Sequence, residues 1–450
     1  MQKKVIQVDQ KVSLLQGLPL SFQHLFAMFG ASILVPALFN GAAGKTVIDP
    51  SLVLLMNGIG TILYLVLCKG RAPAYLGSSF AFLAPTFAVL ASTGGDFSKA
   101  LGGYIVSGLV FVAVALLVGV VGTKWIDVVL PPAAMGPIVA LIGLELSIVA
   151  AGNAGLVSSK QSVIENGAIV MKDVPFDINA VIVSLFTLAV VILGSMLFRG
   201  FLAIIPVLVA IIAGYGLSAV MGVVDYSRIT GESFFSMPQF TFPSFNMSAI
   251  MIILPATLVV VTEHIGHLMV TSKIVGRDLV KDPGLHRSLL GDGISTVLSG
   301  AAGSVPTTTY GENMGVMAIT KVYSVWIIGG AGVISIILAF FGNLKGIINS
   351  IPGPVMGGIS LFLFGLIAAS GIRVLVDSKV DYSKSKNLIL TAVVFIVGIA
   401  GANDPSQGLP SLAIKIGDVY LKGMALAALV GMSLSLLFYI FDRLKLTNEA

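Results

Sequence analysis

Residues 304–321 read SVPTTTYGENMGVMAITK, and this stretch decides the fold. Pro306 and the β-branched run Thr307–Thr309 disfavour a helix. Gly311 followed by Glu312 is typical of the beginning of a helix. We therefore expect a short extended strand that leads directly into a short helix.

The composition around this stretch predicts a membrane protein. Of the 450 residues, 56% are hydrophobic and 10% are charged, and the mean hydropathy is +1.01, whereas soluble domains carry about 25% charged residues. The net charge of +5 follows from basic loop residues, so we assign no nucleic-acid partner. The single cysteine, Cys68, predicts no disulfide. The polar N-terminus lacks a signal-peptide pattern and is expected to stay in the cytoplasm.

A second stretch, residues 73–85, reads PAYLGSSFAFLAP and resembles the first in its interruption. Gly77 and Ser79 precede Phe80, and Pro85 closes the run. Non-helical backbone at membrane depth is tolerated only where it is buried in protein or lines a cavity. Paired interruptions in the two halves of a transporter mark its substrate site. We expect the site where these two stretches meet.

Apolar runs of about 20 residues, the length that crosses a bilayer, predict fourteen spans. The first seven lie near 20–39, 50–69, 75–92, 101–122, 131–151, 179–198 and 200–222. The other seven lie near 247–272, 288–303, 307–320, 322–341, 350–373, 386–402 and 421–441. The interrupted stretches are the third and the tenth of these segments.

The basic residues indicate the orientation of these spans. With the N-terminus inside, the outer segments keep Lys45, Lys99, Lys160, Lys172, Arg228, Lys345, Lys415 and Lys422. That leaves 18 of the 26 lysines and arginines on the cytoplasmic side, as the positive-inside rule requires. Both termini are therefore predicted to be cytoplasmic, in a multi-pass protein of the cell membrane.

The two halves show internal similarity. Residues 57–61 (NGIGT) resemble 292–296 (DGIST), and residues 132–136 (PAAMG) resemble 353–357 (GPVMG), in the same order along the chain. Such a trace indicates a duplicated transporter. Because each copy holds seven spans, an odd number, successive copies enter the membrane in opposite senses. We predict a 7+7 inverted repeat.

Three glutamates, Glu145, Glu263 and Glu312, lie within apolar segments, where a charge costs about 2.5–3.5 kcal/mol on insertion scales. Glu263 and His267, in TEHIGH, are four residues apart and share a helix face. They indicate a substrate ligand with a proton-handling neighbour, although a purely structural pair stays open. Glu312, near the half-helix N-terminus, is expected to bind substrate. Which of Glu263, His267 and Glu312 carries a coupled proton is left open.

Other residues of these segments are expected to contact or support the substrate. Phe80 and Tyr310 can contact the faces or edge of a ring, although an aromatic in a span is more often packing. Asp292 and Asn313 are expected to support the site, as is Ser79. Glu145 is left outside the site, because a structural role at a helix interface explains it equally well.

The motifs of these segments resemble those of the nucleobase–ascorbate transporter family. Residues 312–321, ENMGVMAITK, fit the family signature of Gln, Glu or Pro, then Asn, any residue, Gly, four residues, Thr and a basic or glycine residue. The resemblance covers nearly the whole chain and is strongest to uracil-transporting bacterial members. It implies uracil binding by Glu263, contacts from Phe80, Tyr310, Gly311 and Glu312, and proton coupling through His267.

The resemblance also implies a division into domains. A core domain would comprise residues 20–122 and 223–341, and a gate domain residues 123–222 and 342–441, between cytoplasmic termini 1–19 and 442–450. The core would hold the substrate and the gate would mediate a homodimer. One departure is Phe364, which occupies a position that is tyrosine in a close uracil-transporting member.

The function that the resemblance implies is import of uracil by proton symport, through alternating access between core and gate. A purine symporter for xanthine or uric acid would share the fold and the signature. A passive channel belongs to another class and would not need a titratable pair beside a ligand. We expect no enzyme activity, because HExxH and GxSxG motifs are missing from the sequence. We also expect no metal and no cofactor, with the proton gradient as driving force.

Overall fold

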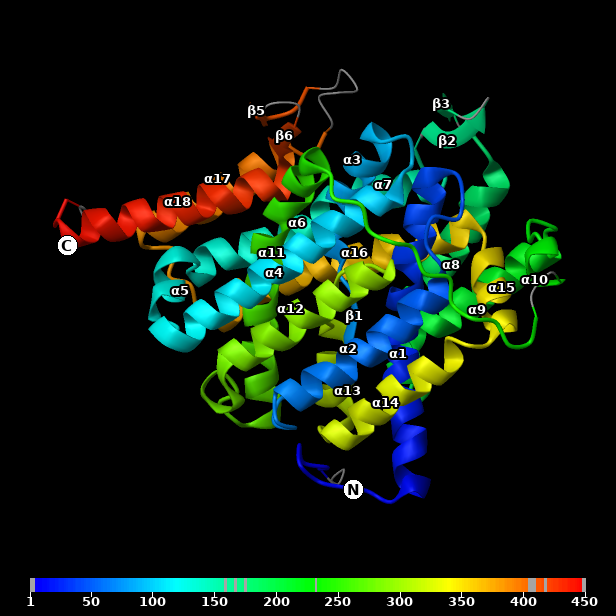
Figure 1. Ribbon diagram of the computed structural model, residues 1–450, viewed down its shortest axis with the longest axis horizontal. Coiled ribbons are helices and arrows are strands. Elements are labelled where there is room, and N and C mark those ends of the chain that lie inside the picture. The colour runs from blue at the N-terminus through cyan, green and yellow to red at the C-terminus, as the bar shows by residue number, and fades with distance from the viewer. Residues whose placement is uncertain are drawn as a thin grey trace.

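The computed structural model describes residues 5–157, 160–165, 168–173, 176–230, 233–403, 410–416 and 419–446. These ranges are predominantly helical (Figure 1). The helices of the first half are α1 (Leu14–Ala43), α2 (Pro50–Leu67), α3 (Leu83–Ser92), α4 (Phe97–Val121), α5 (Lys124–Val129), α6 (Pro132–Glu145), α7 (Ser147–Asn153), α8 (Ile178–Leu197), α9 (Pro206–Val220) and α10 (Ser227–Thr230). Those of the second half are α11 (Met247–Val275), α12 (Leu285–Ala302), α13 (Gly311–Thr320), α14 (Val325–Leu338), α15 (Gly342–Ser350), α16 (Gly353–Asp377), α17 (Ser385–Ala400) and α18 (Gly423–Arg443).

Many of these helices are suited to a bilayer. In the part of the chain that the structure describes, eight helical segments are long and apolar enough to cross a membrane: α1, α2, α4, α6 with α7, α8, α11, α16 and α18. Four shorter apolar helical segments occupy 80–92, 206–220, 325–338 and 385–400. Only 28% of the apolar window of α8 is buried, as expected for a helix that faces lipid. The count of fourteen spans stays a prediction.

Several boundaries differ from the expected ones. The span expected near 131–151 is divided at Leu146 between α6 and α7. The span expected near 200–222 begins with a 3-10 turn, η2 (Leu202–Ile204), before Pro206 opens α9. Proline lacks a backbone N–H and is best tolerated in the first turn of a helix, which explains why α9 begins there.

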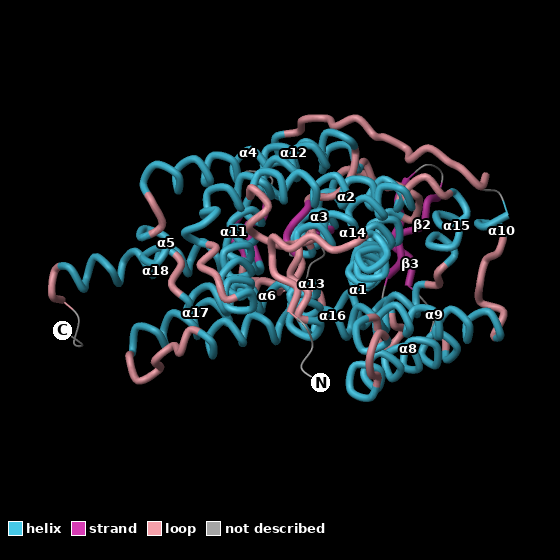
Figure 2. The backbone as a smooth tube through the Cα atoms, turned by 90° about the horizontal axis from the view of Figure 1, so that it is seen from below, coloured by secondary structure: helices cyan, strands magenta, loops and turns pink. Residues whose placement is uncertain are grey.

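The two interrupted stretches form strands that pair with each other. Strand β1 (Leu76–Ser78) pairs antiparallel with β4 (Thr307–Thr309), with Gly77 opposite Thr308. The 3-10 turn η1 (Phe80–Phe82) and α3 follow β1, and α13 follows β4. The prediction of a strand leading into a short helix is confirmed at both places. In Figure 2 this pair of strands lies in the interior, surrounded by helices.

Polar side chains of neighbouring helices complete the hydrogen bonding of these strands. The Leu76 N–H donates to Thr61 Oγ1 on α2 at 2.9 Å. Thr296 Oγ1 on α12 donates to the carbonyl oxygen of Thr307 at 3.1 Å. These bonds matter because a buried, unpaired backbone group costs about 1–3 kcal/mol. The strand pair is thereby fixed between helices of both halves.

Two further strand pairs lie outside the third and tenth segments, the places for which strands were predicted. Strand β2 (Lys160–Glu165) pairs with β3 (Ala168–Asp173), and β5 (Ala413–Ile416) pairs with β6 (Val419–Lys422). The sequence carries Asn-Gly between the first pair and Gly-Asp between the second. Such dipeptides favour two-residue hairpin turns, a signal that lies outside the apolar spans on which the prediction was based.

Glycines allow α4 and α12 to approach closely. A Cβ atom added to Gly108 on α4 would lie 2.8 Å from the carbonyl oxygen of Gly293 on α12. A Cβ atom added to Gly293 would lie 2.7 Å from Phe111 Cβ. Small residues at such crossings are typical of helix packing in membranes. The contact joins a helix of the first half to α12, the helix of the second half that bonds strand β4.

Replacing Gly293 by leucine should therefore destabilise the protein. The added side chain meets backbone atoms of α4 that cannot move aside, and overpacking of this kind typically costs about 1–3 kcal/mol. Gly216→Leu is the matched control, because a Cβ atom at Gly216 meets no atom within 4 Å. We expect a lower thermal unfolding midpoint in detergent for Gly293→Leu only. Equal midpoints for both variants would contradict the close crossing.

Candidate substrate site

The strand pair places two aromatic rings beside each other. Phe80 begins η1 directly after β1, and Tyr310 lies between β4 and α13. Their ring centroids are 6.4 Å apart with an interplanar angle of 19°. A Cβ atom at Gly77 would lie 2.3 Å from the Tyr310 ring, so only glycine leaves room for this ring against β1. Both aromatics that the sequence singled out are brought to one place.

Helix α11 contributes the glutamate and the histidine of the TEHIGH motif. His267 Nε2 lies 4.0 Å from Glu263 Oε1, and both side chains are largely buried. His267 Nδ1 lies 3.1 Å from Thr309 Oγ1 on β4, which ties the histidine to the strand pair. Glu263 Oε2 is buried and has no hydrogen-bond partner among the described residues. A buried acceptor of this kind is suited to a ligand N–H group.

The beginning of α13 completes the site. Gly311 and Glu312 form its first turn, and no side chain caps the helix N-terminus. The first N–H groups of a helix have no partner within the helix, so those of α13 can donate to a ligand. A Cβ atom at Gly311 would lie 3.6 Å from His267 Nε2. Glu312 is the next residue of the same turn.

Asn313 holds this arrangement together through both ends of its amide. Its Oδ1 accepts a hydrogen bond from the Tyr75 N–H at 3.3 Å. Its Nδ2 donates to His24 Nδ1 on α1 at 3.0 Å. Asn313 thus connects the half-helix to the beginning of β1 and to the first helix. Ser79, also expected to support the site, donates its backbone N–H to the carbonyl oxygen of Pro306 at 2.9 Å.

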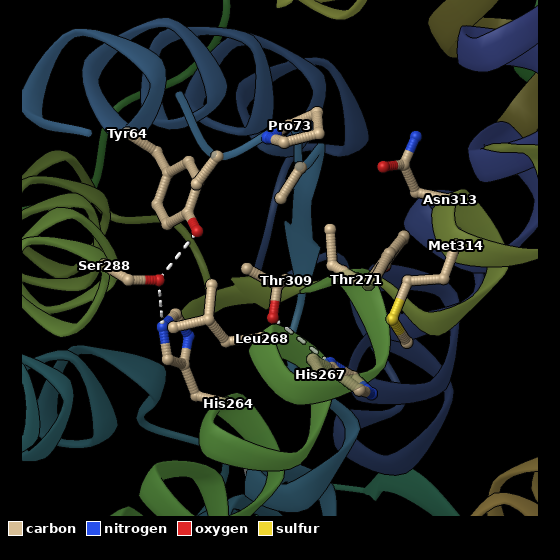
Figure 3. A pocket seen from close by; sticks show the side chains of 13 residues that line it. Tyr64, Pro73, His264, His267, Leu268, Thr271, Ser288, Thr309, Asn313 and Met314 are labelled. Carbon is tan, nitrogen blue, oxygen red and sulfur yellow. Dashed lines mark hydrogen bonds between the residues drawn. The ribbon is translucent and has the colours of Figure 1, made fainter. Parts of the chain in front are cut away.

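Asp292, predicted as a supporting residue, belongs to a chain of buried hydrogen bonds that the sequence did not reveal. Its Oδ2 lies 2.8 Å from His264 Nδ1. His264 Nε2 lies 2.7 Å from Ser288 Oγ, which lies 2.7 Å from the Tyr64 hydroxyl (Figure 3). Ser288 and Asp292 are four residues apart on α12, a spacing that places them on one face. Their partners on α11 and α2 could not be inferred from spacing.

Two residues that the sequence left undecided are also placed. The ring of Phe364 on α16 lies 5.8 Å from that of Phe80 at 80°, so the departure from tyrosine falls directly beside the site. Glu145 lies elsewhere, where its Oε2 accepts a hydrogen bond from the Met424 N–H at 3.0 Å. That N–H belongs to the first turn of α18, so the partly buried carboxylate has a structural partner there.

An apolar helical protein whose interrupted segments meet at buried carboxylates has the architecture of a membrane transporter. A model of a permease family (Xan_ur_permease) matches residues 15–407. The chain belongs to this permease family, and the membership predicted from the motifs is confirmed.

Similar proteins extend over the whole length of the chain. The uracil permease of Paenibacillus larvae subsp. larvae is 53% identical over 449 residues, which cover 100% of both chains. The uracil permease of Escherichia coli strain K12 is 52% identical over 445 residues, which cover 99% of this chain and 96% of its own. The uracil permease of Bacillus caldolyticus is 43% identical over 444 residues, with 97% and 95% covered.

Solved transporter structures share the fold at low identity. The murine anion transporter Slc26a9 in the inward-facing state gives a TM-score of 0.68 at 12% identity, covering 96% of this chain and 69% of that one. The transmembrane domain of the cyanobacterium bicarbonate transporter BicA gives a TM-score of 0.59 at 14% identity, covering 95% and 100%. These likenesses concern the fold alone.

Asn313→Ala should weaken the junction of strand and half-helix. The change removes both bonds of the amide and leaves the buried Tyr75 N–H without its acceptor, at a cost of about 1–3 kcal/mol. Asn387→Ala is the control, because the Asn387 amide bonds the carbonyl oxygen of Asp381 on an exposed part of the chain. Thermal unfolding in detergent should show a lower midpoint for Asn313→Ala alone. An unchanged midpoint would contradict the bridging role.

Proposed function

We propose that this permease imports uracil by proton symport. One observation carries the proposal. The N-terminus of α13, which no side chain caps, lies beside His267 and near Glu263, whose Oε2 has no hydrogen-bond partner among the described residues. Relatives that share 52–53% of their residues with the whole chain are named uracil permease. The hydrogen-bond donors and acceptors of uracil match the acceptors and donors of this site.

The uracil ring has two N–H donors, two carbonyl acceptors and two apolar faces. The carboxyl groups of Glu263 and Glu312 accept from the N–H groups, and the free N–H groups of α13 beginning at Gly311 donate to a carbonyl. Phe80 and Tyr310 offer their rings to the face or edge of the base. This set of partners matches each polar edge of the ring without a metal or a cofactor.

The charges of the two glutamates explain why a proton would be transported together with uracil. Two carboxylates at one buried site repel each other when both are ionised, and Glu263 and Glu312 interact electrostatically. A proton taken up together with uracil removes this repulsion. His267, 4.0 Å from Glu263 and bonded to Thr309, is the adjacent group that can exchange the proton. Coupling of this kind draws on the proton gradient.

The packing of the helices supports alternating access between two domains. One group of helices packs around the strand pair, with α12 against α4 and α2, and α14 against α2 and α1. Another group packs α6 against α16 and α17, and α8 against α9 and α16. Contacts such as Phe80 with Phe364 join the groups at the site. We assign the core to the first group and the gate to the second.

This assignment completes the proposed architecture. Fourteen spans form a 7+7 inverted repeat, with both termini in the cytoplasm of a cell whose inner or plasma membrane holds the protein. The gate helices mediate a homodimer. The core, with Glu263 and Glu312, moves against the gate and exposes the site alternately to each side.

Two other functions lead to different outcomes in one assay. A purine symporter would have the same fold and would prefer xanthine or uric acid. A passive facilitator would transport uracil but would not respond to the proton gradient. Uptake of labelled uracil into a transport-deficient host, with unlabelled uracil, thymine, xanthine, uric acid and ascorbate as competitors, distinguishes these functions. We expect uracil to compete best and uptake to fall when the gradient is collapsed.

Removing either glutamate of the site should abolish this uptake while the protein stays folded. Glu263→Gln replaces an acceptor of a ring N–H by an amide, and Glu312→Ala removes the second acceptor. We expect at least a tenfold loss of uracil uptake for each. Glu145→Gln is the matched control, a partly buried glutamate outside the site, and should keep uptake within twofold. Normal binding of uracil by both site variants would refute the assignment.

A further inference from the structure

The buried chain of Tyr64, Ser288, His264 and Asp292 has no part in the substrate contacts described above. It links three helices, α2, α11 and α12, by consecutive contacts of 2.7, 2.7 and 2.8 Å. All four side chains are essentially inaccessible to solvent. We propose that this chain is the release path of the coupled proton, from the substrate site to the cytoplasmic end of the core. The proposal rests on the proposed symport.

The chain lies between the substrate site and one end of the helices. His264 follows Glu263 directly on α11. Tyr64 lies three residues before the end of α2 at Leu67, and Ser288 three residues after the beginning of α12 at Leu285. At a rise of about 1.5 Å per residue, both hydroxyl groups come from residues within about one turn of those helix ends. The distribution of basic residues assigns these ends to the cytoplasm.

A small cavity connects the chain to the histidine of the substrate site. It is about 10 Å³ in volume and is lined by His267, His264, Ser288 and Tyr64, among others. That volume is near the lower limit for one water molecule. Figure 3 shows His264 and His267 from α11 lining this pocket, each with its own hydrogen-bond partner. The cavity thus brings both histidines to the wall of one space, and the proposed route of the proton from His267 to His264 runs through it.

The arrangement of donors and acceptors allows transfer without a charged intermediate on a hydroxyl group. When His264 is protonated, its Nδ1–H donates to Asp292, and its Nε2–H gives a proton to Ser288 Oγ. Ser288 passes its own hydroxyl proton to the Tyr64 oxygen, and Tyr64, which is closed to solvent here, passes its proton to water once the core opens to the cytoplasm. Each O–H bond that breaks is replaced by another, so His264 alone ends with one proton fewer.

Three titratable side chains lie near the His264 ring. Asp292 on α12 lies 2.8 Å from Nδ1, the Tyr64 ring on α2 packs edge-on against it, and His267, also on α11, lines the same cavity. Asp292 is the carboxylate in direct contact with the ring. The 2.8 Å contact between Asp292 Oδ2 and His264 Nδ1 gives two neighbouring atoms between which a proton can be shared before release.

Breaking the chain at its outermost hydroxyl group tests the proposal. Tyr64→Phe keeps the ring, which packs edge-on against His264 at 6.3 Å, and removes only the hydroxyl group. In proteoliposomes we expect uracil-induced proton influx and uptake driven by a pH gradient to fall at least tenfold. Exchange of labelled for unlabelled uracil at equal pH should stay within threefold of wild type, because exchange needs no net release of a proton.

Two further variants separate a relay from a structural role. Tyr104→Phe is the matched control, since Tyr104 is also fully buried and its hydroxyl group bonds Thr86 Oγ1 at 2.7 Å. It should retain both exchange and proton influx within twofold. Ser288→Ala interrupts the chain at its centre and should behave like Tyr64→Phe.

Three outcomes would overturn the relay. Normal proton influx in Tyr64→Phe would show that the chain carries no proton. A parallel loss of exchange and influx in Tyr64→Phe and Ser288→Ala would show that their role is structural. Uracil transport without proton influx in the wild type would refute the symport itself, and this result is distinguishable because it does not depend on any variant.

Discussion

The antiparallel pairing of β1 with β4 is the constraint on which the rest of the structure depends. Backbone N–H and C=O groups inside a bilayer must find partners within the protein, and two broken segments satisfy this need by pairing with each other. Thr61 and Thr296 supply bonds from the flanking helices. Because the strands end where they do, η1 and α13 begin inside the protein, and the rings of Phe80 and Tyr310 lie side by side there.

Polar side chains buried around this pair divide into groups with different tasks. Asn313 joins the half-helix to the preceding segment and to α1. Glu263 and His267 face the beginning of α13 and are suited to a ligand and a proton. His264, their neighbour in sequence, points to Ser288 and Asp292 instead. One turn of α11 thus serves both the substrate site and the hydrogen-bonded chain behind it.

The sequence predicted the elements that obey local rules. Proline, β-branched residues and glycine are sufficient to locate β4 and the beginning of α13, and intramembrane charge locates Glu263 and Glu312. Contacts between residues far apart in the sequence could not be predicted from local patterns. The partners of His264 come from two other helices, and the ring of Phe364 reaches Phe80 only through the packing of α16. Hairpins at 160–173 and 413–422 were missed because their turn signals lie outside the apolar spans.

The central claim is that substrate binds where the strand pair meets the half-helix. A crystal structure of the protein with 5-bromouracil tests this most directly, because the anomalous scattering of bromine locates the ligand independently of its shape. The account predicts the base beside Phe80 and Tyr310, with its N–H groups toward Glu263 and Glu312. An ordered base bound elsewhere, with these side chains free of ligand, would contradict it.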